Sequence, residues 1–564
     1  MSRTPLSTAT SLLAAALVLA ACDRPADAPG PSGTDGENQA SRAGIDAADF
    51  AAHVQALSSD EFAGRAPGSI GEEKTVAYLT AEFERLGLQP GNDGSYLQTV
   101  PMVETTADAS TVLTLQVDGE PRELQFGSDM VINTRTGEAQ VEIDDSQLVF
   151  VGYGVNAPEL GWNDYAGVDV EGKTVVMFVN DPGFHTEDAE LFEGQRMTYY
   201  GRWTYKYEEA ARQGAAAAIV IHDTEGASYG WDVVKNSWSG PQFDLPAAGD
   251  PNPRLPAQGW ITGDVARSLM SDLGHDLDEL YTAANQRGFE AIALDATLSL
   301  DLASTTSLKT SPNLVAILPG TTQADEAIVY MGHWDHIGDH EGEGDTIYNG
   351  AIDNATGIAG ILEIAEAFVN QEPAPERSVV FLAVTLEESG LLGSQYYVAN
   401  PSVPLEQTVA VINLDALPVI GPARDMTVVG FGSSQLEDIL KQQTDTQDRV
   451  LKAEATPESG FYFRSDHFNF AKAGVPALYA KGGDDLIEGG VDAGQRAQSD
   501  YRNNRYHQPG DEFDPNWNFE GVIQDLEALY GVGRELAANE QWPTWYEGNP
   551  FLAAQQQLRG SAAE

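Results

Sequence analysis

Residues 327–338 read AIVYMGHWDHIG, an apolar run that ends abruptly in two histidines and an aspartate. The run has the length and composition of a buried strand. Similar apolar runs, NLVAIL (313–318), SVVFLAV (378–384) and TVAVINL (408–414), lie around it, with the helix-like segment ATGIAGILEIAEAFV (355–369) between them. Alternation of strand and helix is typical of a parallel sheet covered on both faces. The sequence therefore predicts an α/β fold with a mostly parallel, mixed sheet flanked by helices.

Polar side chains stand where these apolar runs end. His333 and Asp335 follow one run, Glu387 and Glu388 follow another, and Asp415 follows a third. In open α/β sheets, ligands bind outside the carboxyl ends of the strands. We therefore expect these side chains to meet at one edge of the sheet.

The spacing of these residues indicates metal chemistry. His333 and Asp335 are two residues apart, so they point to the same side of an extended chain, where the carboxylate can orient the imidazole. Asp353 lies in GAIDNATG (350–357), a turn ahead of a helix, where one carboxylate could bridge two cations. His507, in YHQPGD (506–511), adds a second imidazole. Nitrogen and oxygen ligands of this kind suit zinc.

Glu387 and Glu388 are adjacent, so their side chains diverge, and one can bind metal while the other faces the substrate. Each motif alone has an ordinary explanation: a histidine and an aspartate two apart occur often by chance, and YHQPGD could be a simple turn. The metal interpretation depends on all of them occurring together in one domain.

Six motifs in order resemble the two-zinc aminopeptidase family that includes aminopeptidase Y and bacterial leucyl aminopeptidases. They are GHWDHIG (332–338), GAIDNATG (350–357), TLEESGLLGS (385–394), INLDAL (412–417), RSDHFNFAKAGVPAL (464–478) and YHQPGDEFD (506–514). Residues 57–90 also resemble the amino-terminal segment of that family. The resemblance implies a peptidase domain in two parts, residues 45–145 and 307–545, followed by a tail at 546–564.

The resemblance also implies a ligand set for two zinc ions. His333 and Asp415 would hold one ion, Glu388 and His507 the other, and Asp353 would bridge both. No ligand position departs from the family pattern.

The implied catalytic residues surround these ligands. Asp335 would orient His333, Glu387 would be the general base towards a hydroxide that bridges the zinc ions, and Tyr506 would stabilise the tetrahedral intermediate. The expected activity is a zinc-dependent exopeptidase that hydrolyses N-terminal residues from peptides with a free N-terminus. The alternatives are a carboxypeptidase or dipeptidase of the same fold, and a non-catalytic, lipid-anchored peptide-binding protein.

Residues 146–306 resemble the protease-associated domain, a β-rich module inserted into several extracellular peptidases. GYG (152–154), WNDYAGVDVEGK (162–173) and EEAARQGAAA (208–217) support this resemblance. A role in substrate binding is expected for this module, and catalysis is not.

The first residues resemble a bacterial lipoprotein signal. Arg3, an apolar stretch at 12–19 and LAAC (19–22) predict a signal peptide at 1–21 and lipidation of Cys22, the only cysteine. A plain secretory signal is the alternative. Residues 22–44 are rich in Pro, Gly, Ser and Asp and predict a flexible linker. The expected location is the bacterial cell envelope, lipid-anchored on the periplasmic side of the inner or outer membrane or on the cell surface.

The length and composition of the chain limit the number of domains and the kinds of partner. A chain of 564 residues is too long for one hydrophobic core, so at least two domains are expected. The net charge is −55, and the sequence has no basic patch of the size that nucleic-acid binding requires. We therefore expect no nucleic-acid partner.

Overall fold

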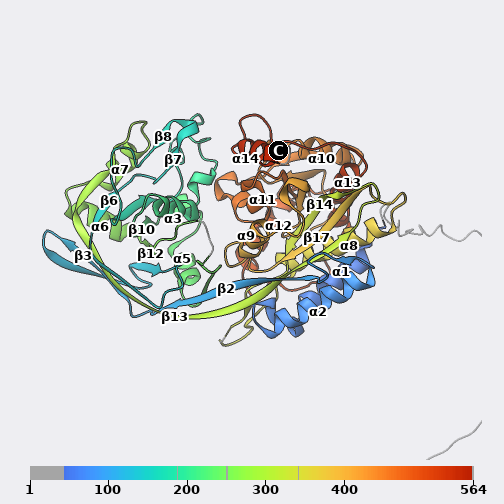
Figure 1. Ribbon diagram of the computed structural model, residues 1–564, viewed down its shortest axis with the longest axis horizontal. Coiled ribbons are helices and arrows are strands. Elements are labelled where there is room, and N and C mark those ends of the chain that lie inside the picture. Colours follow the sequence, from blue (N-terminus) through green and yellow to red (C-terminus); the bar gives the residue numbers. More distant parts are fainter. Residues whose placement is uncertain (1–43, 187, 249–251, 341, 562–564) are drawn as a thin grey trace, which may run out of the picture. The chain divides into compact units, whose positions relative to one another are not determined.

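The computed structural model describes residues 44–561, apart from positions 187, 249–251 and 341 (Figure 1). The predicted signal peptide, Cys22 and nearly all of the predicted linker lie outside the described residues. Among the helices that the structure describes, none combines the length and the apolar character needed to cross a membrane.

The main sheet carries the histidines and is mixed, as predicted. Four neighbouring strands are parallel: β17 (Arg377–Val384), β14 (Gln323–His333), β18 (Thr408–Asn413) and β21 (Ala477–Gly482). Antiparallel strands flank them, β13 (Ile292–Leu318) beside β17 and β19 (Asp425–Val428) beside β21. Short strands β1 (Gln89–Pro90) and β20 (Val450–Ala453) pair with β13 and β19. Every residue of β17 and β18 is buried, which explains their uninterrupted apolar sequence.

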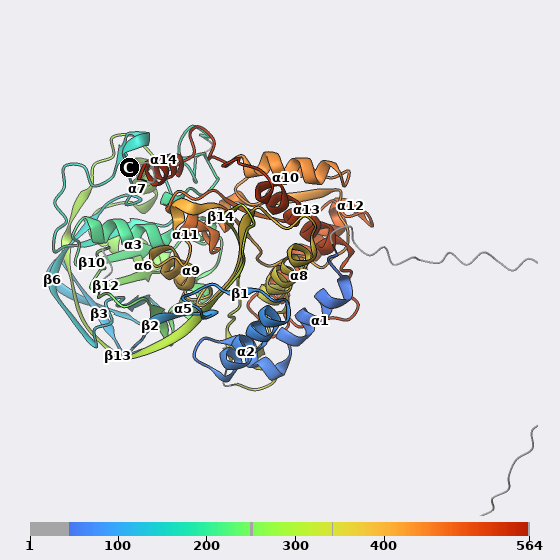
Figure 2. The same ribbon diagram turned by 45° about the vertical axis from the view of Figure 1, so that its right-hand side comes forward.

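Helices cover both faces of the main sheet (Figure 2). Along β14, Ile328 and Tyr330 belong to one hydrophobic cluster, whereas Val329 and Met331 belong to another, because successive side chains point to opposite faces. The first cluster includes residues of α1 (Ala47–Leu57), α2 (Ile70–Arg85), α8 (Thr356–Asn370), α10 (Leu436–Asp445) and α13 (Glu520–Ala537). The second includes residues of α9 (Leu392–Ala399) and α11 (His467–Lys472), with α14 (Leu552–Ser561) packed against it.

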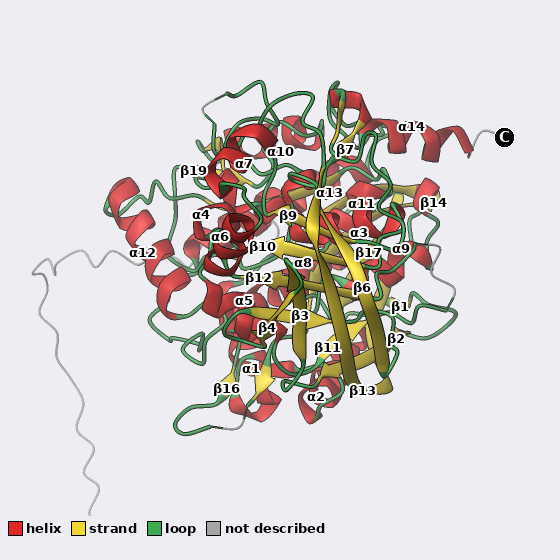
Figure 3. Ribbon diagram, turned by 90° about the vertical axis from the view of Figure 1, so that its left-hand side faces the viewer, coloured by secondary structure: helices red, strands yellow, loops and turns green. Residues whose placement is uncertain are grey.

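A second sheet lies in the part of the chain where the protease-associated module is predicted (Figure 3). Its strand order is β4 (Glu120–Gln125), β3 (Val112–Val117), β13, β6 (Gln140–Phe150), β9 (Thr174–Phe178), β10 (Ala217–Ile221), β12 (Ala257–Ile261) and β5 (Met130–Asn133). Helices α3 (Trp203–Arg212) and α5 (Trp231–Trp238) pack on one face, and α6 (Gly263–Asp272) and α7 (Leu277–Ala284) on the other.

Strand β13 belongs to both sheets. Its residues 292–303 pair with β6, and its residues 304–314 pair with β2 (Leu97–Ala107). Strands β3 to β6 share a hydrophobic core with the second sheet. The packing therefore differs from the predicted boundary at residues 145 and 146: the chain leaves the main sheet at the end of β2 and returns within β13.

Candidate metal centre

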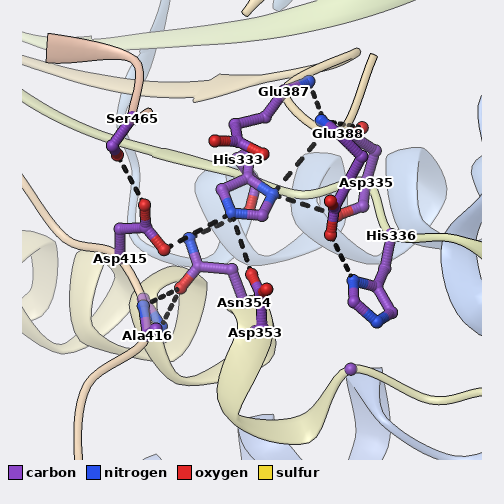
Figure 4. Close-up of polar contacts among 12 residues, drawn as sticks. His333, Asp335, His336, Asp353, Asn354, Glu387, Glu388, Asp415, Ala416 and Ser465 are labelled. Carbon is purple, nitrogen blue, oxygen red and sulfur yellow. Dashed lines mark hydrogen bonds and ion pairs between the residues drawn. The ribbon is translucent and has the colours of Figure 1, made fainter. Parts of the chain in front are cut away.

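Four of the five predicted ligands, His333, Asp353, Glu388 and Asp415, lie together at the carboxyl end of the parallel strands (Figure 4). His333 is the last residue of β14, Glu387 and Glu388 follow β17, and Asp415 follows β18. Three groups in this region bring ligand atoms within 4.8 Å of one another. They are His333 with Asp353 and Asp415, His336 with Asp353 and Glu388, and His333 with Glu387 and Glu388.

Asp353 lies between two histidines. Its Oδ1 is 3.2 Å from Nε2 of His333, and its Oδ2 is 3.3 Å from Nε2 of His507. His333 Nε2 also lies 3.6 Å from Oδ1 of Asp415, and His507 Nε2 lies 3.0 Å from Oε2 of Glu388. The five predicted ligands thus form two groups that share one carboxylate.

The chemistry of this cluster fits zinc. Its donors are imidazole nitrogens and carboxylate oxygens, the ligand types that zinc binds in hydrolases. His333, Asp353 and Asp415 are buried, and buried carboxylates this close together require a positive charge between them.

In the metal-free protein, protons on His333 and His507 supply that positive charge. Burial lowers the pKa of His333, but Glu387, Asp353 and Asp415 outweigh burial and raise it well above its usual value. Burial also lowers the pKa of His507, but Glu388 and Asp353 outweigh burial and raise that pKa to about 10. A proton therefore sits on each imidazole where a cation would bind.

The two adjacent glutamates differ in acidity. Burial raises the pKa of Glu388, but the charges of His507 and His336 outweigh burial and lower it to about 2. Burial also raises the pKa of Glu387, and the neighbouring carboxylates of Glu388 and Asp415 raise it further, well above the usual value. Glu388 is thus an anion, as a metal ligand must be, whereas Glu387 holds a proton readily.

Asp335 acts differently from the expected orienting carboxylate. Its Oδ1 is 3.9 Å from Nδ1 of His333, too far for a hydrogen bond, whereas its backbone oxygen is 3.1 Å from that nitrogen. The carboxylate instead accepts hydrogen bonds from the backbone N–H groups of Glu387 at 3.2 Å and Glu388 at 3.4 Å. Asp335 therefore holds the strand end that carries both glutamates, and its main-chain oxygen faces His333.

Tyr506 lies beside the cluster, as expected. Its ring stacks on that of His507 with centroids 3.9 Å apart. Burial and the carboxylates of Asp353 and Glu388 raise the pKa of its hydroxyl well above the usual value, so the hydroxyl stays protonated and can donate.

Three residues outside the predicted ligand set support the ligands, and of these sequence reasoning missed Asp511. His336, interpreted from sequence as a rim residue or a support behind the ligands, is buried, with Nδ1 2.6 Å from Oε1 of Glu388. The carboxylate of Asp511 accepts the backbone N–H groups of Ile352 and Asp353 at 3.0–3.1 Å.

The third residue is Ser465, whose hydroxyl donates to Oδ2 of Asp415 at 2.5 Å. All three residues lie inside motifs quoted above. Their membership of a motif was therefore the one sequence signal that could have pointed to them. Their partners lie on other segments of the chain.

Comparisons with known proteins found a peptidase family and relatives that match parts of this chain. Residues 313–530 match the sequence profile of peptidase family M28. A probable zinc metalloprotease of Pyrenophora tritici-repentis (strain Pt-1C-BFP) is 34% identical over 148 residues, which cover 26% of this chain and 29% of that protein. A probable leucine aminopeptidase of Arthroderma benhamiae is 32% identical over 174 residues, which cover 30% of this chain and 46% of that protein. The matched region thus spans less than half of either relative.

The solved structure of an aminopeptidase from Aneurinibacillus sp. strain AM-1 superposes over 88% of this chain and 95% of its own, with a TM-score of 0.50 and 20% identity. This superposition covers both sheets and shows a shared fold. Residues 313–530 therefore have the sequence pattern of peptidase family M28, in a chain that has the fold of an aminopeptidase.

Proposed function

We propose that this protein is a zinc-dependent aminopeptidase that removes N-terminal residues from peptides at the cluster around Asp353. The observation that carries the proposal is the pair of ligand groups sharing Asp353, with Glu387 beside them. The match of residues 313–530 to a peptidase family supports it.

Two zinc ions would fit the two groups. His333 and Asp415 would hold one ion, Glu388 and His507 the other, and Asp353 would contact both. Zinc bound there would polarise the scissile carbonyl group and lower the pKa of a water molecule.

Glu387 has the properties of a general base. Its raised pKa means that its carboxylate accepts a proton readily, and the same group can then pass the proton to the leaving amine. The hydroxyl of Tyr506, which stays protonated, would donate a hydrogen bond to the oxygen on which negative charge develops. The surrounding carboxylates favour a substrate ammonium group, which sets the register of an aminopeptidase.

Two activity measurements test this proposal. Leucine p-nitroanilide and a peptide with an amidated carboxyl end should be hydrolysed, and the same peptide with an acetylated N-terminus should not. Glu387→Gln should lower kcat by at least about 100-fold while zinc content, measured by mass spectrometry, stays unchanged. Glu366→Gln, on the surface of α8, is the matched control. Cleavage of the acetylated peptide from its carboxyl end would instead favour the carboxypeptidase alternative.

We also propose, from the sequence alone, that Cys22 carries a lipid that tethers the protein in the bacterial cell envelope. Mass spectrometry of the mature N-terminus tests this, with Cys22→Ser as the comparison. An unmodified Cys22 in membrane-extracted protein would contradict it.

A further inference from the structure

Glu388 has a different partner on each of its two carboxylate oxygens (Figure 4). Oε2 lies 3.0 Å from Nε2 of His507, the histidine with which Glu388 would share a zinc ion. Oε1 lies 2.6 Å from Nδ1 of His336, a buried residue outside the predicted ligand set. While the contact with His336 lasts, only one oxygen of Glu388 is free to bind a metal ion.

Asp415 is arranged in the same way on the other side of Asp353. Its Oδ1 lies 3.6 Å from Nε2 of His333, whereas its Oδ2 accepts a hydrogen bond from the hydroxyl of Ser465 at 2.5 Å. The side-chain amide of Asn413 donates to that same hydroxyl at 2.6 Å. The hydroxyl oxygen therefore accepts from Asn413, and its single proton points to Asp415.

The distances separate metal ligands from the residues that hold them. Two atoms that bind one tetrahedral zinc ion, each at about 2.0–2.1 Å, lie about 3.3 Å apart. The four histidine–carboxylate pairs around Asp353 are 3.0–3.6 Å apart, as co-ligands should be. The 2.6 Å between His336 and Glu388 is instead the length of a direct, charge-assisted hydrogen bond. His336 is thus better placed to hold Glu388 than to bind the same ion beside it.

The ring of His336 is held in one orientation. Its backbone N–H donates to the backbone oxygen of Arg65 at 3.4 Å. The ring also lies against Gly350, where a Cβ atom would stand 2.6 Å from Cγ and Cδ2 of the imidazole. Within the described residues its buried Nε2 has no hydrogen-bond partner, whereas Nδ1 faces the carboxylate. The proton therefore belongs on Nδ1, which donates to Glu388.

We propose that His336 and Ser465 are positioning residues that make Glu388 and Asp415 bind zinc through one oxygen each. This proposal rests on the proposed two-zinc peptidase function. A carboxylate that used both oxygens would take one more coordination position at its ion. Catalytic zinc requires an open position for water and substrate. The two donors therefore keep coordination positions free for the reaction.

A matched pair of variants at His336 tests the first donor. Asn places an amide N–H where Nδ1 stands, and Leu has nearly the same shape without a donor. In cobalt-loaded protein, the visible absorption of the metal weakens as its coordination number rises. We expect His336→Leu to weaken this absorption, because Oε1 of Glu388 becomes free to bind the metal, and to lower kcat by about 10- to 100-fold. His336→Asn should restore a large part of both.

Ser465→Ala tests the second donor at the other ion, and it also carries the test if His336→Leu does not fold. We expect the same loss of cobalt absorption and of kcat, with two metal ions still bound per chain by mass spectrometry. His340→Leu, at an exposed position in the same loop as His336, is the matched control and should change neither quantity. An unchanged cobalt spectrum in the folded variants would overturn the proposal. Loss of one metal ion from His336→Leu would also overturn it, because His336 would then be a ligand.

The cobalt spectrum separates this proposal from the proposed function. If the wild type hydrolyses leucine p-nitroanilide but neither variant changes the spectrum, only the positioning role is wrong. If the wild type binds two cobalt ions and both variants weaken the absorption, but no peptide is hydrolysed, the positioning role stands and the peptidase function is wrong. A wild type that binds no cobalt or zinc would overturn both.

Discussion

Glu387 and Glu388 show how far one residue position can change the chemistry of a side chain. Both are half-buried and follow β17, yet the pKa of Glu388 falls to about 2 and that of Glu387 rises. The difference comes from neighbours, because Glu388 faces His336 and His507 whereas Glu387 lies among other carboxylates. The backbone N–H groups of both residues donate to the carboxylate of Asp335.

Zinc binding should release protons. Because the pKa of His507 is about 10 and that of His333 is well above its usual value, both imidazoles are protonated at pH 7.5, and a metal ligand must be neutral. Titration calorimetry of the metal-free protein in buffers of different ionisation enthalpy should give about two protons released if zinc fills the two proposed sites. A value near zero would contradict the protonated cluster.

Glu363 should make stability depend on pH. Burial raises the pKa of this carboxyl on α8 to about 7, while the unfolded chain keeps the usual value of 4.5. The folded state therefore binds the proton more tightly, so the free energy of unfolding falls as pH rises from about 4.5 to 7.

Glu363→Gln keeps an oxygen for the backbone N–H of Asp46, which Glu363 accepts at 2.7 Å, and removes the charge. We expect it to raise the free energy of unfolding at pH 8 by on the order of 1–3 kcal/mol and to change it little at pH 4.5. Urea denaturation at both pH values measures this. Glu488→Gln, at an exposed position outside α8, is the control, and an equal effect of Glu363→Gln at both pH values would refute the prediction.

At the scale of elements, the segment after α1 supports the loops around the candidate metal centre through the side chain of Arg65. Arg65 is 1% exposed and donates to four backbone oxygens, those of Leu57, Trp334, Asn349 and Gly350, at 2.6–2.9 Å. Trp334 lies between His333 and Asp335, and Gly350 lies three residues before Asp353. One side chain thus connects the amino-terminal helices to two loops that carry ligands.

Arg65→Met should therefore weaken both stability and metal binding. It leaves four buried carbonyl oxygens without their donor, and we expect a loss of about 3–5 kcal/mol in the free energy of unfolding. We expect zinc affinity to fall as well, by about 10- to 100-fold, because the ligand loops lose a fixed support. Denaturation and zinc titration measure the two effects. Arg85→Met, on the exposed face of α2, is the control, and an unchanged zinc affinity in folded Arg65→Met would contradict the supporting role.

At the scale of the whole described unit, β2 and β13 carry the chain between two sheets with separate cores. A second contact lies next to the metal centre, where Tyr199 packs between the two parts of the chain. Its hydroxyl donates to Glu208 at 2.5 Å, and its ring contacts Phe463 and Phe468. This contact holds the segment before α3 against residues 457–468.

Tyr199→Ala should reduce peptide hydrolysis without removing zinc. Loss of the ring loosens the packing on Phe463 and Phe468, which flank Ser465, the donor to Asp415. A misplacement of about 1 Å near the reacting groups can cost about 100-fold in rate. We expect kcat/KM for Leu-Ala to fall at least about 10-fold while zinc content stays the same. Tyr199→Phe keeps the ring and should retain most activity. Equal losses in both variants would show that the hydroxyl, and not the packing, matters.

The sequence by itself determined the α/β class, the strand ends and the ligand candidates. It could do so because apolar strands buried on both faces are uninterrupted in sequence, and because polar residues at their carboxyl ends interrupt the pattern sharply. Strand β14, which ends at His333, is the clearest case. Local spacing also placed Asp353 in a turn ahead of α8.

Only the tertiary structure decided which groups pair, because pairing joins residues that are far apart in the chain. His336 contacts Glu388 across 52 positions, and Arg65 reaches Gly350 across 285. The sequence also could not show that β3 to β6 pack with the second sheet, since alternating strands look alike whichever sheet they join.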